Sequence, residues 1–162
     1  MAETFDQYIF TPVGWLEICA TEQALVSISF VEEEGISSPV QPLVMKQVVC
    51  QLNEYFEGVR LDFDVPLDPV GSDFQKKVWK LVTQVKYGET ASYLDIAIAS
   101  GSEKNTRAVG LANGKNPIPI VIPCHRIIGS NGKLTGYAGG IDKKRWLLQH
   151  ELQYSVSKNR LF

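Results

Sequence analysis

Short apolar segments separated by turn residues fill the first third of the chain. Three of them are rich in Phe, Ile, Val and Tyr and are predicted to form β-strands, at residues 5–10, 14–20 and 25–31. From Leu43 to Phe56 the apolar positions recur at helical spacing and Gly58 follows, so this stretch predicts a helix. A further short strand is expected at residues 61–65. This half of the chain has the pattern of a small α/β domain.

The second half is mainly helical in pattern. Ser72 and Gln75 form a capping-box pattern, and an apolar stripe follows it. Helices are predicted at residues 73–85, 92–100, 103–113 and 142–154. The second and third are short and joined by a glycine turn, which resembles a helix-turn-helix, although most small helical hairpins do not bind DNA. Residues 127–134 contain Asn131-Gly132 and predict a tight hairpin.

Residues 66–71 hold two prolines and a glycine and read as a linker. The sequence therefore predicts an α+β protein with an N-terminal α/β domain at residues 1–70 and a second, mainly α domain at residues 72–152. Residues 153–162 are expected to form a basic C-terminal tail, either loose or docked.

The net charge changes sign at this linker. Residues 1–71 carry two basic and twelve acidic side chains, a net charge of −10, whereas residues 72–162 carry fourteen basic and six acidic ones, a net charge of +8. A basic half is the expected electrostatic footprint of a nucleic-acid-binding surface. Attraction between an acidic and a basic domain of one chain explains the split equally well, so charge alone leaves both interpretations open.

The composition limits the compartment, the partners and the cofactors that are expected for this chain. No apolar run approaches the ~20 residues of a membrane span, and no secretory signal is visible, so no membrane partner is expected. Three widely spaced cysteines argue against a disulfide framework and favour a reducing compartment, the cytoplasm (or the nucleus in a eukaryote). The three cysteines and two histidines contain no paired-ligand motif, so neither a metal nor another cofactor is expected.

Cys124 stands out because His125 and Arg126 follow it directly. A lone cysteine is most often a small buried hydrophobe, but nearby cations or a histidine base raise its thiolate fraction. Neighbours on an extended chain point to opposite faces, so contact between Cys124 and His125 needs a turn or a bridging water. A cysteine peptidase is disfavoured, because only His150 remains as a distant base and no peptidase signature surrounds Cys124.

Five segments in order resemble the O6-alkylguanine-DNA alkyltransferase family, the methylated-DNA–protein-cysteine methyltransferases. The resemblance covers residues 72–152, and the first 70 residues fit by length and by their strand-then-helix pattern. The segments that carry it are Gly88-Glu89-Thr90-Ala91-Ser92-Tyr93, Arg107-Ala108-Val109-Gly110, Asn116-Pro117-Ile118-Pro119 with Ile122-Pro123-Cys124-His125-Arg126-Ile127-Ile128, Gly136-Tyr137-Ala138-Gly139-Gly140, and Trp146-Leu147-Leu148-Gln149-His150-Glu151.

The resemblance implies an N-terminal ribonuclease H-like domain and a C-terminal winged-helix-like domain with a helix-turn-helix. It also implies a catalytic set. Cys124 would accept the alkyl group, His125 would act through a water as base, and Glu151 would orient His125. Tyr93 would donate a proton to the departing guanine, and Asn116 would fix the loop before the cysteine.

The resemblance further implies a DNA-binding set: Arg107, which would fill the gap left by a flipped base, with Tyr93, Ala108, Gly110 and Arg126. A substrate pocket would include Ile127, Tyr137 and Ala138. The family often carries a serine where this chain has Ala138, so a side-chain donor to guanine O6 is missing. This puts substrate range and rate in doubt more than activity.

The implied function is DNA repair by a monomer that acts once. It would bind double-stranded DNA containing O6-alkylguanine, flip the base and move the alkyl group irreversibly onto its own cysteine, with O4-methylthymine as an expected second substrate. Two alternatives remain. One is a non-catalytic protein that binds alkylated lesions and recruits other repair factors. The other is a transcriptional regulator, which would need sequence-specific binding to undamaged DNA.

Overall fold

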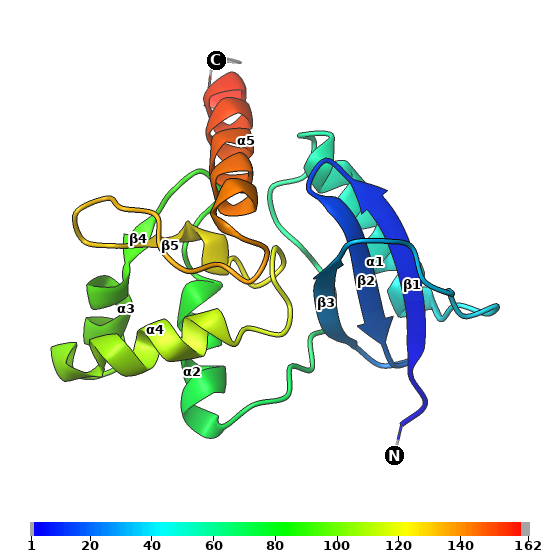
Figure 1. The fold of residues 1–162 in the computed structure, drawn as a ribbon, viewed down its shortest axis with the longest axis horizontal. Coiled ribbons are helices and arrows are strands. Elements are labelled where there is room, and N and C mark those ends of the chain that lie inside the picture. The colour runs from blue at the N-terminus through cyan, green and yellow to red at the C-terminus, as the bar shows by residue number, and fades with distance from the viewer. Residues whose placement is uncertain (1, 160–162) are drawn as a thin grey trace. The chain divides into compact units, whose positions relative to one another are not determined.

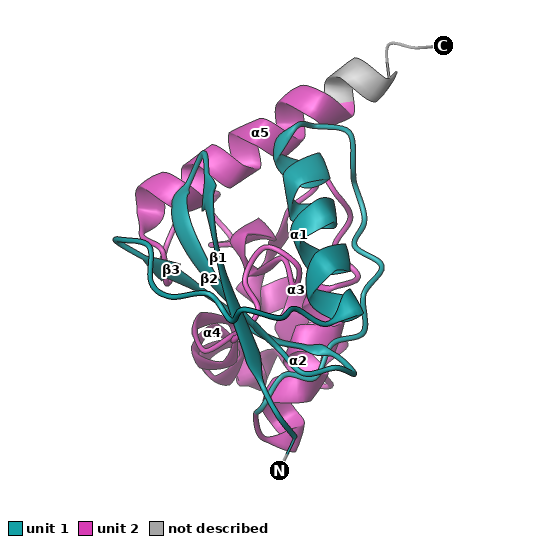
Figure 2. Cartoon of the chain, turned by 90° about the vertical axis from the view of Figure 1, so that its right-hand side faces the viewer, with its two compact units in different colours: residues 1–70 teal, residues 71–162 magenta. Residues whose placement is uncertain are grey.

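The computed structural model describes residues 2–159, and the chain divides into two compact units, Met1–Val70 and Gly71–Phe162 (Figure 2). Within the described residues, no helix has the length and apolar character needed to cross a lipid bilayer.

Unit 1 is a three-stranded antiparallel sheet with one helix on it (Figure 1). Its strands are β1 (Phe5–Thr11), β2 (Gly14–Ala20) and β3 (Leu25–Val31), and its helix is α1 (Leu43–Phe56). The helix has the predicted bounds because its apolar positions form one stripe that packs against the sheet. The core between them is made of fully buried side chains, namely Leu16, Ile18, Leu25, Met45, Val48, Leu52 and Tyr55.

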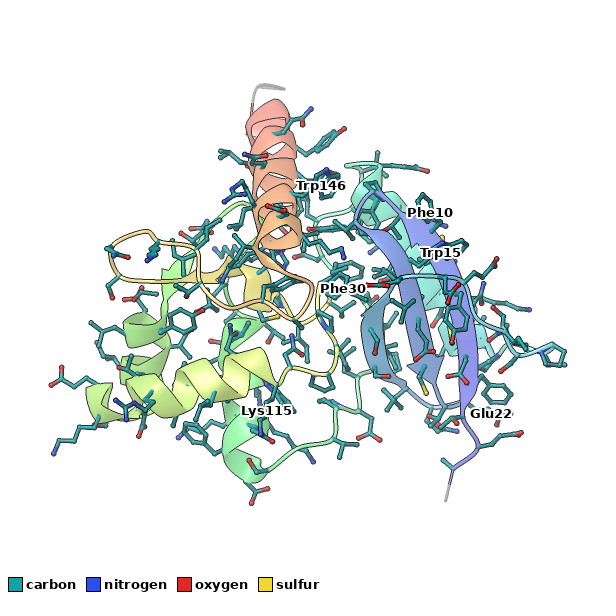
Figure 3. All side chains as sticks on the ribbon, in the orientation of Figure 1. Phe10, Trp15, Glu22, Phe30, Lys115 and Trp146 are labelled. Atoms are coloured by element: carbon teal, nitrogen blue, oxygen red, sulfur yellow. The ribbon has the colours of Figure 1, made fainter. Side chains whose placement is uncertain are left out.

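The outer face of this sheet also carries aromatic side chains. Phe10 and Trp15 are directly opposite in the β1–β2 register, and their ring centroids lie 5.2 Å apart in an edge-on arrangement (Figure 3). Such a cross-strand pair stabilises the hairpin that joins the two strands.

The strand expected at residues 61–65 does not form. The Gln51 side chain donates to the Asp64 carbonyl at 3.2 Å and accepts from the Asp64 N–H at 2.8 Å, so an amide side chain takes the two backbone groups that a strand would use. Pairing with the sheet occurs further along, as a single parallel bridge between Leu25 and Leu67. Pro66 has no N–H and limits that pairing.

Unit 2 is mainly helical (Figure 1). Two capping boxes start its first two α-helices: the Ser72 side chain accepts from the Gln75 N–H, and the Ser92 side chain accepts from the Asp95 N–H. In chain order its elements are α2 (Asp73–Val82), β4 (Ala91–Ser92), α3 (Tyr93–Ala99), η1 (Glu103–Asn105), α4 (Thr106–Gly114), η2 (Cys124–Arg126), β5 (Ile127–Ile128) and α5 (Ile141–Asn159).

The prediction of a β-hairpin at residues 127–134 is wrong. β5 instead pairs in parallel with β4, so that Ile127 lies opposite Ala91. The glycine-rich turn does form, because the Gly129 N–H donates to the Lys133 carbonyl at 3.0 Å and Gly132 has a φ of 81°. The turn therefore closes a loop, while a segment from much earlier in the chain supplies the partner strand.

The closing helix is longer than expected. α5 continues past Tyr154 to Asn159, so most of the predicted tail is helical. The rest of that tail, Arg160-Leu161-Phe162, lies outside the described residues.

Candidate active site

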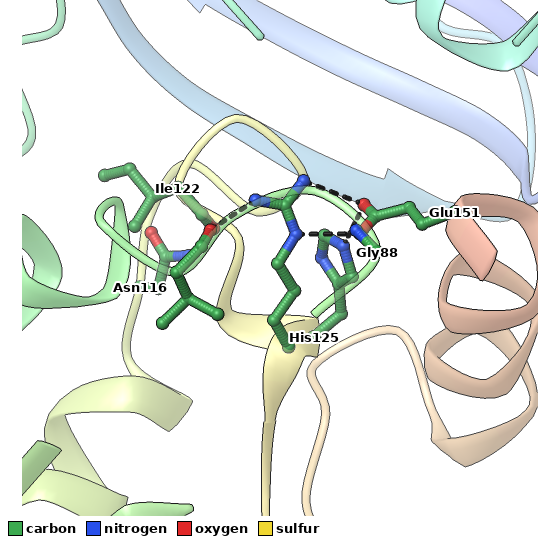
Figure 4. A network of polar contacts seen from close by, with 7 residues as sticks. Gly88, Asn116, Ile122, His125 and Glu151 are labelled. Atoms are coloured by element: carbon green, nitrogen blue, oxygen red, sulfur yellow. Dashed lines mark hydrogen bonds and ion pairs between the residues drawn. The ribbon is translucent and has the colours of Figure 1, made fainter. Parts of the chain in front are cut away.

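The loop before Cys124 is held by one side chain. Asn116 follows α4, donates its amide N–H to the Ile122 carbonyl at 2.8 Å and accepts from the Ile118 N–H at 2.9 Å (Figure 4). Inside this loop Ile120 has a φ of 74°, a conformation that is strained for a β-branched residue. Ile118, Ile120 and Ile122 are all buried, so apolar packing holds the loop in that shape.

Cys124 begins η2, so the chain here forms a turn. It is not the extended backbone on which neighbouring side chains point to opposite faces. The Arg126 N–H donates to the Pro123 carbonyl at 3.0 Å, which bends the chain so that consecutive side chains no longer alternate between two faces. The Cys124 carbonyl accepts from the Asn113 amide at 3.3 Å. Cys124 itself is only 5 % exposed.

The Cys124 thiol is neutral at rest. Its burial raises its pKa to about 11, although a hydrogen bond from Asn116 and the charge of Lys144 act in the opposite direction. A thiolate is the reactive form, so attack by Cys124 requires removal of its proton by a base.

His125 is the base that the structure offers. Its Nε2 lies 2.6 Å from Glu151 Oε2, and its Nδ1 is buried with no hydrogen-bond partner among residues 2–159 (Figure 4). The carboxylate can only accept, so Nε2 carries the hydrogen and Nδ1 keeps a free lone pair. Burial lowers the pKa of His125, against the pull of Glu151, so the imidazole is neutral.

Glu151 is ionised although it is almost fully buried. Burial alone would raise its pKa, but His125 and Arg126 together hold that pKa well below its ordinary value. Arg126 donates from Nε to Oε1 at 2.7 Å and from Nη2 to Oε2 at 3.0 Å, a bidentate pair. The Gly88 N–H also donates to Oε1, at 3.4 Å. These contacts fix the orientation of the Glu151 carboxylate and keep it ionised.

Arg126 does not lie where the expected DNA contact would need it. It is only 6 % exposed, and its remaining nitrogen, Nη1, donates to the Val85 carbonyl at 2.7 Å. Its guanidinium is thus engaged inside unit 2, which does not support a role on the DNA surface. Arg126 instead neutralises the carboxylate of Glu151, which supports the base His125.

Tyr93 begins α3 beside a cavity of about 620 Å³. Its hydroxyl donates to the Thr135 carbonyl at 3.4 Å and accepts from the Thr135 hydroxyl at 3.2 Å. A cavity of this size, with small residues and two tyrosines on its walls, can hold a single nucleobase. Its lining residues are Tyr93, Thr106, Gly110, Gly114, Thr135, Gly136, Tyr137 and Ala138.

The expected pocket residues differ in position. Tyr137 and Ala138 line the cavity, whereas Ile127 is fully buried in β5 and is not among the residues that line it. Burial raises the pKa of Tyr137 well above its ordinary value, and the negative charge of a Cys124 thiolate acts in the same direction. Lys144 Nζ donates both to the Thr135 carbonyl in the cavity wall and to the Ile127 carbonyl in the strand after the Cys124 turn, so the cavity loop is joined to the segment of the nucleophile.

Three of the expected DNA-contacting residues, Arg107, Ala108 and Gly110, lie on α4. Arg107 and Ala108 are exposed, and Gly110 is half-buried at the cavity wall, where an added Cβ would lie 3.9 Å from the Tyr93 ring. Val109 between them is buried in the core. The exposed face of this short helix therefore presents one cation, small residues and the apolar side chain of Leu111.

The sequence did not reveal three further residues of the site: Asn113, Thr135 and Lys144. Of these, Lys144 had a detectable signal, because its spacing from Leu147 and Glu151 puts it on the inward face of α5. Within residues 2–159 no group of three His, Cys, Asp or Glu side chains is placed to hold a metal ion.

Two family models cover almost the whole chain. The 6-O-methylguanine DNA methyltransferase ribonuclease-like domain matches residues 5–69, and the DNA-binding domain of the same family matches residues 73–153. These matches confirm the expected fold class of two joined domains.

Curated relatives and solved structures agree with these models. The methylated-DNA–protein-cysteine methyltransferase of Mycobacterium tuberculosis H37Rv is 44% identical over 95% of this chain and 96% of its own, and that of Methanosarcina barkeri is 45% identical over 88% and 94%. A crystal structure of the M. tuberculosis O6-methylguanine methyltransferase superposes with a TM-score of 0.85 at 43% identity, covering 94% of both chains. A crystal structure of M. tuberculosis OGT in complex with DNA gives 0.83 at 45% identity, covering 91% and 92%. The chain therefore belongs to the 6-O-methylguanine DNA methyltransferase family.

Proposed function

We propose that this protein repairs DNA by moving the methyl group of O6-methylguanine irreversibly onto Sγ of Cys124. The observation that carries the proposal is the buried Cys124 thiol beside a neutral His125. Glu151 and Arg126 hold that imidazole so that one nitrogen keeps a free lone pair. Membership of the family and the match to relatives named methylated-DNA–protein-cysteine methyltransferase support the same reaction.

The reaction balances with these groups alone. His125 Nδ1 takes the thiol proton of Cys124 through a bridging water, and the sulfur then attacks the methyl carbon. An S–C bond forms as the C–O6 bond breaks, and the electron pair passes to the guanine. The Tyr93 hydroxyl protonates the guanine at N3 and recovers a proton from the imidazolium through solvent, and exchange with solvent then moves the added proton from N3 to N1. The products are a thioether and ordinary guanine.

The target base must leave the duplex, because its O6-methyl group is not accessible inside the stack. We place the flipped base in the cavity walled by Tyr93, Tyr137 and Ala138. Arg107, exposed on α4, would fill the gap that the base leaves, since a planar guanidinium can stack between bases. O4-methylthymine carries the same O-alkyl group beside a ring nitrogen and is proposed as a second substrate.

DNA affinity in this proposal comes mainly from phosphate contacts. The net charge of +8 over residues 72–162 suits a polyanion and predicts binding that weakens as salt increases. We propose that the protein acts as a monomer in the cytoplasm, where a reducing environment keeps its nucleophile as a free thiol.

The direct test is single-turnover repair. The protein is incubated with a duplex that contains one O6-methylguanine, and peptide mass mapping then locates any added methyl group. The expected result is one methyl group on Cys124 and ordinary guanine in the DNA, with no change for the matched guanine duplex. A persistent lesion with unmodified Cys124 would overturn the proposal. Cys124→Ala, if it binds the lesion duplex without repairing it, separates the enzyme from a lesion-binding protein.

A further inference from the structure

A buried lysine sits at the start of the closing helix of unit 2. Lys144 is in the first turns of α5, and its side chain is 0 % exposed. Lysine is almost never fully buried unless it is paired, because removing an ammonium from water is costly. The position is also unfavourable for the helix, since the positive end of the helix dipole repels a cation there. Helix stability therefore does not explain this residue.

The ammonium joins two segments that are separate in the sequence. Lys144 Nζ donates to the Ile127 carbonyl at 2.6 Å and to the Thr135 carbonyl at 2.8 Å. Ile127 belongs to β5, directly after the turn that holds Cys124, whereas Thr135 lies in the loop that walls the cavity. The lysine thus ties that loop to the strand behind the nucleophile.

The same contact reaches Tyr93. The Thr135 carbonyl that accepts from Lys144 also accepts from the Tyr93 hydroxyl, and Lys144 Nζ lies 5.9 Å from the centroid of the Tyr93 ring. Loss of Lys144 would free Thr135, and with it the hydroxyl that must meet the departing guanine. Charge-assisted bonds of this kind hold a geometry more firmly than neutral ones.

We propose that Lys144 is a positioning residue for methyl transfer, which ties the cavity loop and Tyr93 to the Cys124 segment and favours the Cys124 thiolate through its charge. This inference rests on the proposed role of Cys124 as acceptor. The charge of Lys144 lowers the pKa of the Cys124 thiol against the effect of its burial, and a Cys124 thiolate in turn raises the pKa of Lys144 against the effect of its own burial.

Other ionisable groups face the same region as Lys144, and their charges must be considered together with its own. Within the described residues they come from three elements and one loop: Tyr93 on α3, Cys124, His125 and Arg126 on η2, Tyr137 in the cavity loop, and Glu151 on α5. Arg126 and Glu151 neutralise each other in their bidentate pair, and His125 is neutral. Lys144 is held by two carbonyls, so no carboxylate among these groups neutralises its charge.

The test separates the effect of the Lys144 charge from the effect of its hydrogen bonds to the two carbonyls. Lys144→Gln keeps amide N–H groups that can reach the carbonyls but removes the charge, whereas Lys144→Arg keeps a charge. Lys46→Met removes an exposed lysine from α1 in unit 1 and serves as the matched control. The rate of Cys124 modification by iodoacetamide is measured against pH, with peptide mass mapping to distinguish it from Cys19 and Cys50. Methyl transfer from O6-methylguanine DNA is measured on the same proteins.

Lys144→Gln is expected to move the midpoint of the iodoacetamide profile up by about one pH unit, which makes modification about tenfold slower at neutral pH. Lys144→Arg should keep the midpoint near that of the parent but transfer methyl more slowly, because the larger guanidinium displaces the loop. Lys46→Met should match the parent in both measurements.

A purely structural role for Lys144 would slow methyl transfer in both variants and leave both midpoints unchanged, which would overturn the inference. Should Lys144→Gln fail to fold, a raised midpoint in folded Lys144→Arg would overturn it as well. The iodoacetamide profile needs no DNA. Failure of the parent protein to transfer methyl would therefore count against the proposed function and not against the influence of Lys144 on the thiol.

Discussion

Arg126 and Glu151 form a bidentate ion pair inside unit 2, with 2.7 Å between Nε and Oε1 and 3.0 Å between Nη2 and Oε2. The carboxylate oxygen Oε2 also accepts from His125 at 2.6 Å. Because the guanidinium neutralises and orients the carboxylate, Glu151 can aim the imidazole without taking its proton. Arg126, which follows His125 directly in the sequence, thus supports this base indirectly. It acts through Glu151, which lies 25 positions after it.

Glu151→Gln should reduce both stability and activity. Removing one partner leaves Arg126 buried without an anion, which costs roughly 3–5 kcal/mol of the free energy of unfolding. His125 loses its orientation, so single-turnover methyl transfer should fall about 10²-fold or more. Urea unfolding and rapid-quench assays measure the two effects, with exposed Glu57→Gln in unit 1 as the control. A folded Glu151→Gln protein with the parent rate would show that the carboxylate does not support the base.

Stability should depend on pH through His125. Burial lowers the pKa of His125 in the folded state, whereas in the unfolded chain it binds a proton near pH 6.5. Its contribution to folding is therefore fully present above about pH 6.5 and is lost as pH falls below that value. The free energy of unfolding, from urea titrations, should decrease from about pH 7.5 to about pH 5. His125→Asn should flatten this slope, and an equal slope in both proteins would assign it to another group.

Methylation of Cys124 should destabilise the folded protein. The side chain is 5 % exposed, and an added methyl group in a packed site costs typically about 1–3 kcal/mol. The melting temperature of protein methylated by lesion DNA should therefore lie below that of protein treated with the matched undamaged duplex. Equal melting temperatures for the two samples would show that the site has room for the methyl group.

The two capping serines should separate stability from activity. Ser72→Ala and Ser92→Ala each remove a side chain that accepts from the backbone of the first helical turn, at a cost of about 0.5–2 kcal/mol each. Only Ser92 caps the helix that begins with Tyr93, so only Ser92→Ala should also slow methyl transfer beyond what its melting temperature predicts. Equal rates in the two variants would show that the position of Tyr93 does not depend on this cap.

Ala138→Ser should raise the rate of methyl transfer. Ala138 is exposed on the cavity wall, and a hydroxyl there could donate to guanine O6 as the methyl group leaves. One such hydrogen bond contributes about 0.5–1.5 kcal/mol, so the expected gain is a few-fold. Ala138→Val, which adds bulk without a donor, is the matched control. An equal rate for the serine variant and the parent would show that a backbone N–H already meets O6.

Local sequence patterns predicted those elements whose cause is local. The helix from Leu43 to Phe56 and the start of α3 at Ser92 followed from periodicity and capping, which depend on residues within one or two turns. The hairpin at residues 127–134 failed because its turn is local but its strand partner, Ala91-Ser92, is not. The expected strand at residues 61–65 failed because Gln51 bonds to the backbone of Asp64.

The same distinction holds for the site. Cys124, His125 and Glu151 could be named from the family resemblance, but the sequence did not show that Arg126 turns inward to Glu151. The expected DNA-binding set included Arg126, and only the three-dimensional arrangement gives this arginine a buried partner. The spacing of Lys144 from Leu147 and Glu151 places it on the inward face of α5, but its role was missed because its partners are two backbone carbonyls, which leave no mark in a sequence.

The burial of Cys124 has a consequence for a protein that reacts only once. Small electrophiles in the cell meet the exposed Cys50 more readily than Cys124, whose thiol is both shielded and protonated at rest. Under the proposed reaction, each molecule keeps its one reactive thiol until a flipped base enters the cavity and brings its methyl carbon to the sulfur. Low reactivity at rest protects the supply of active protein, so the number of lesions that can be repaired approaches the number of molecules made.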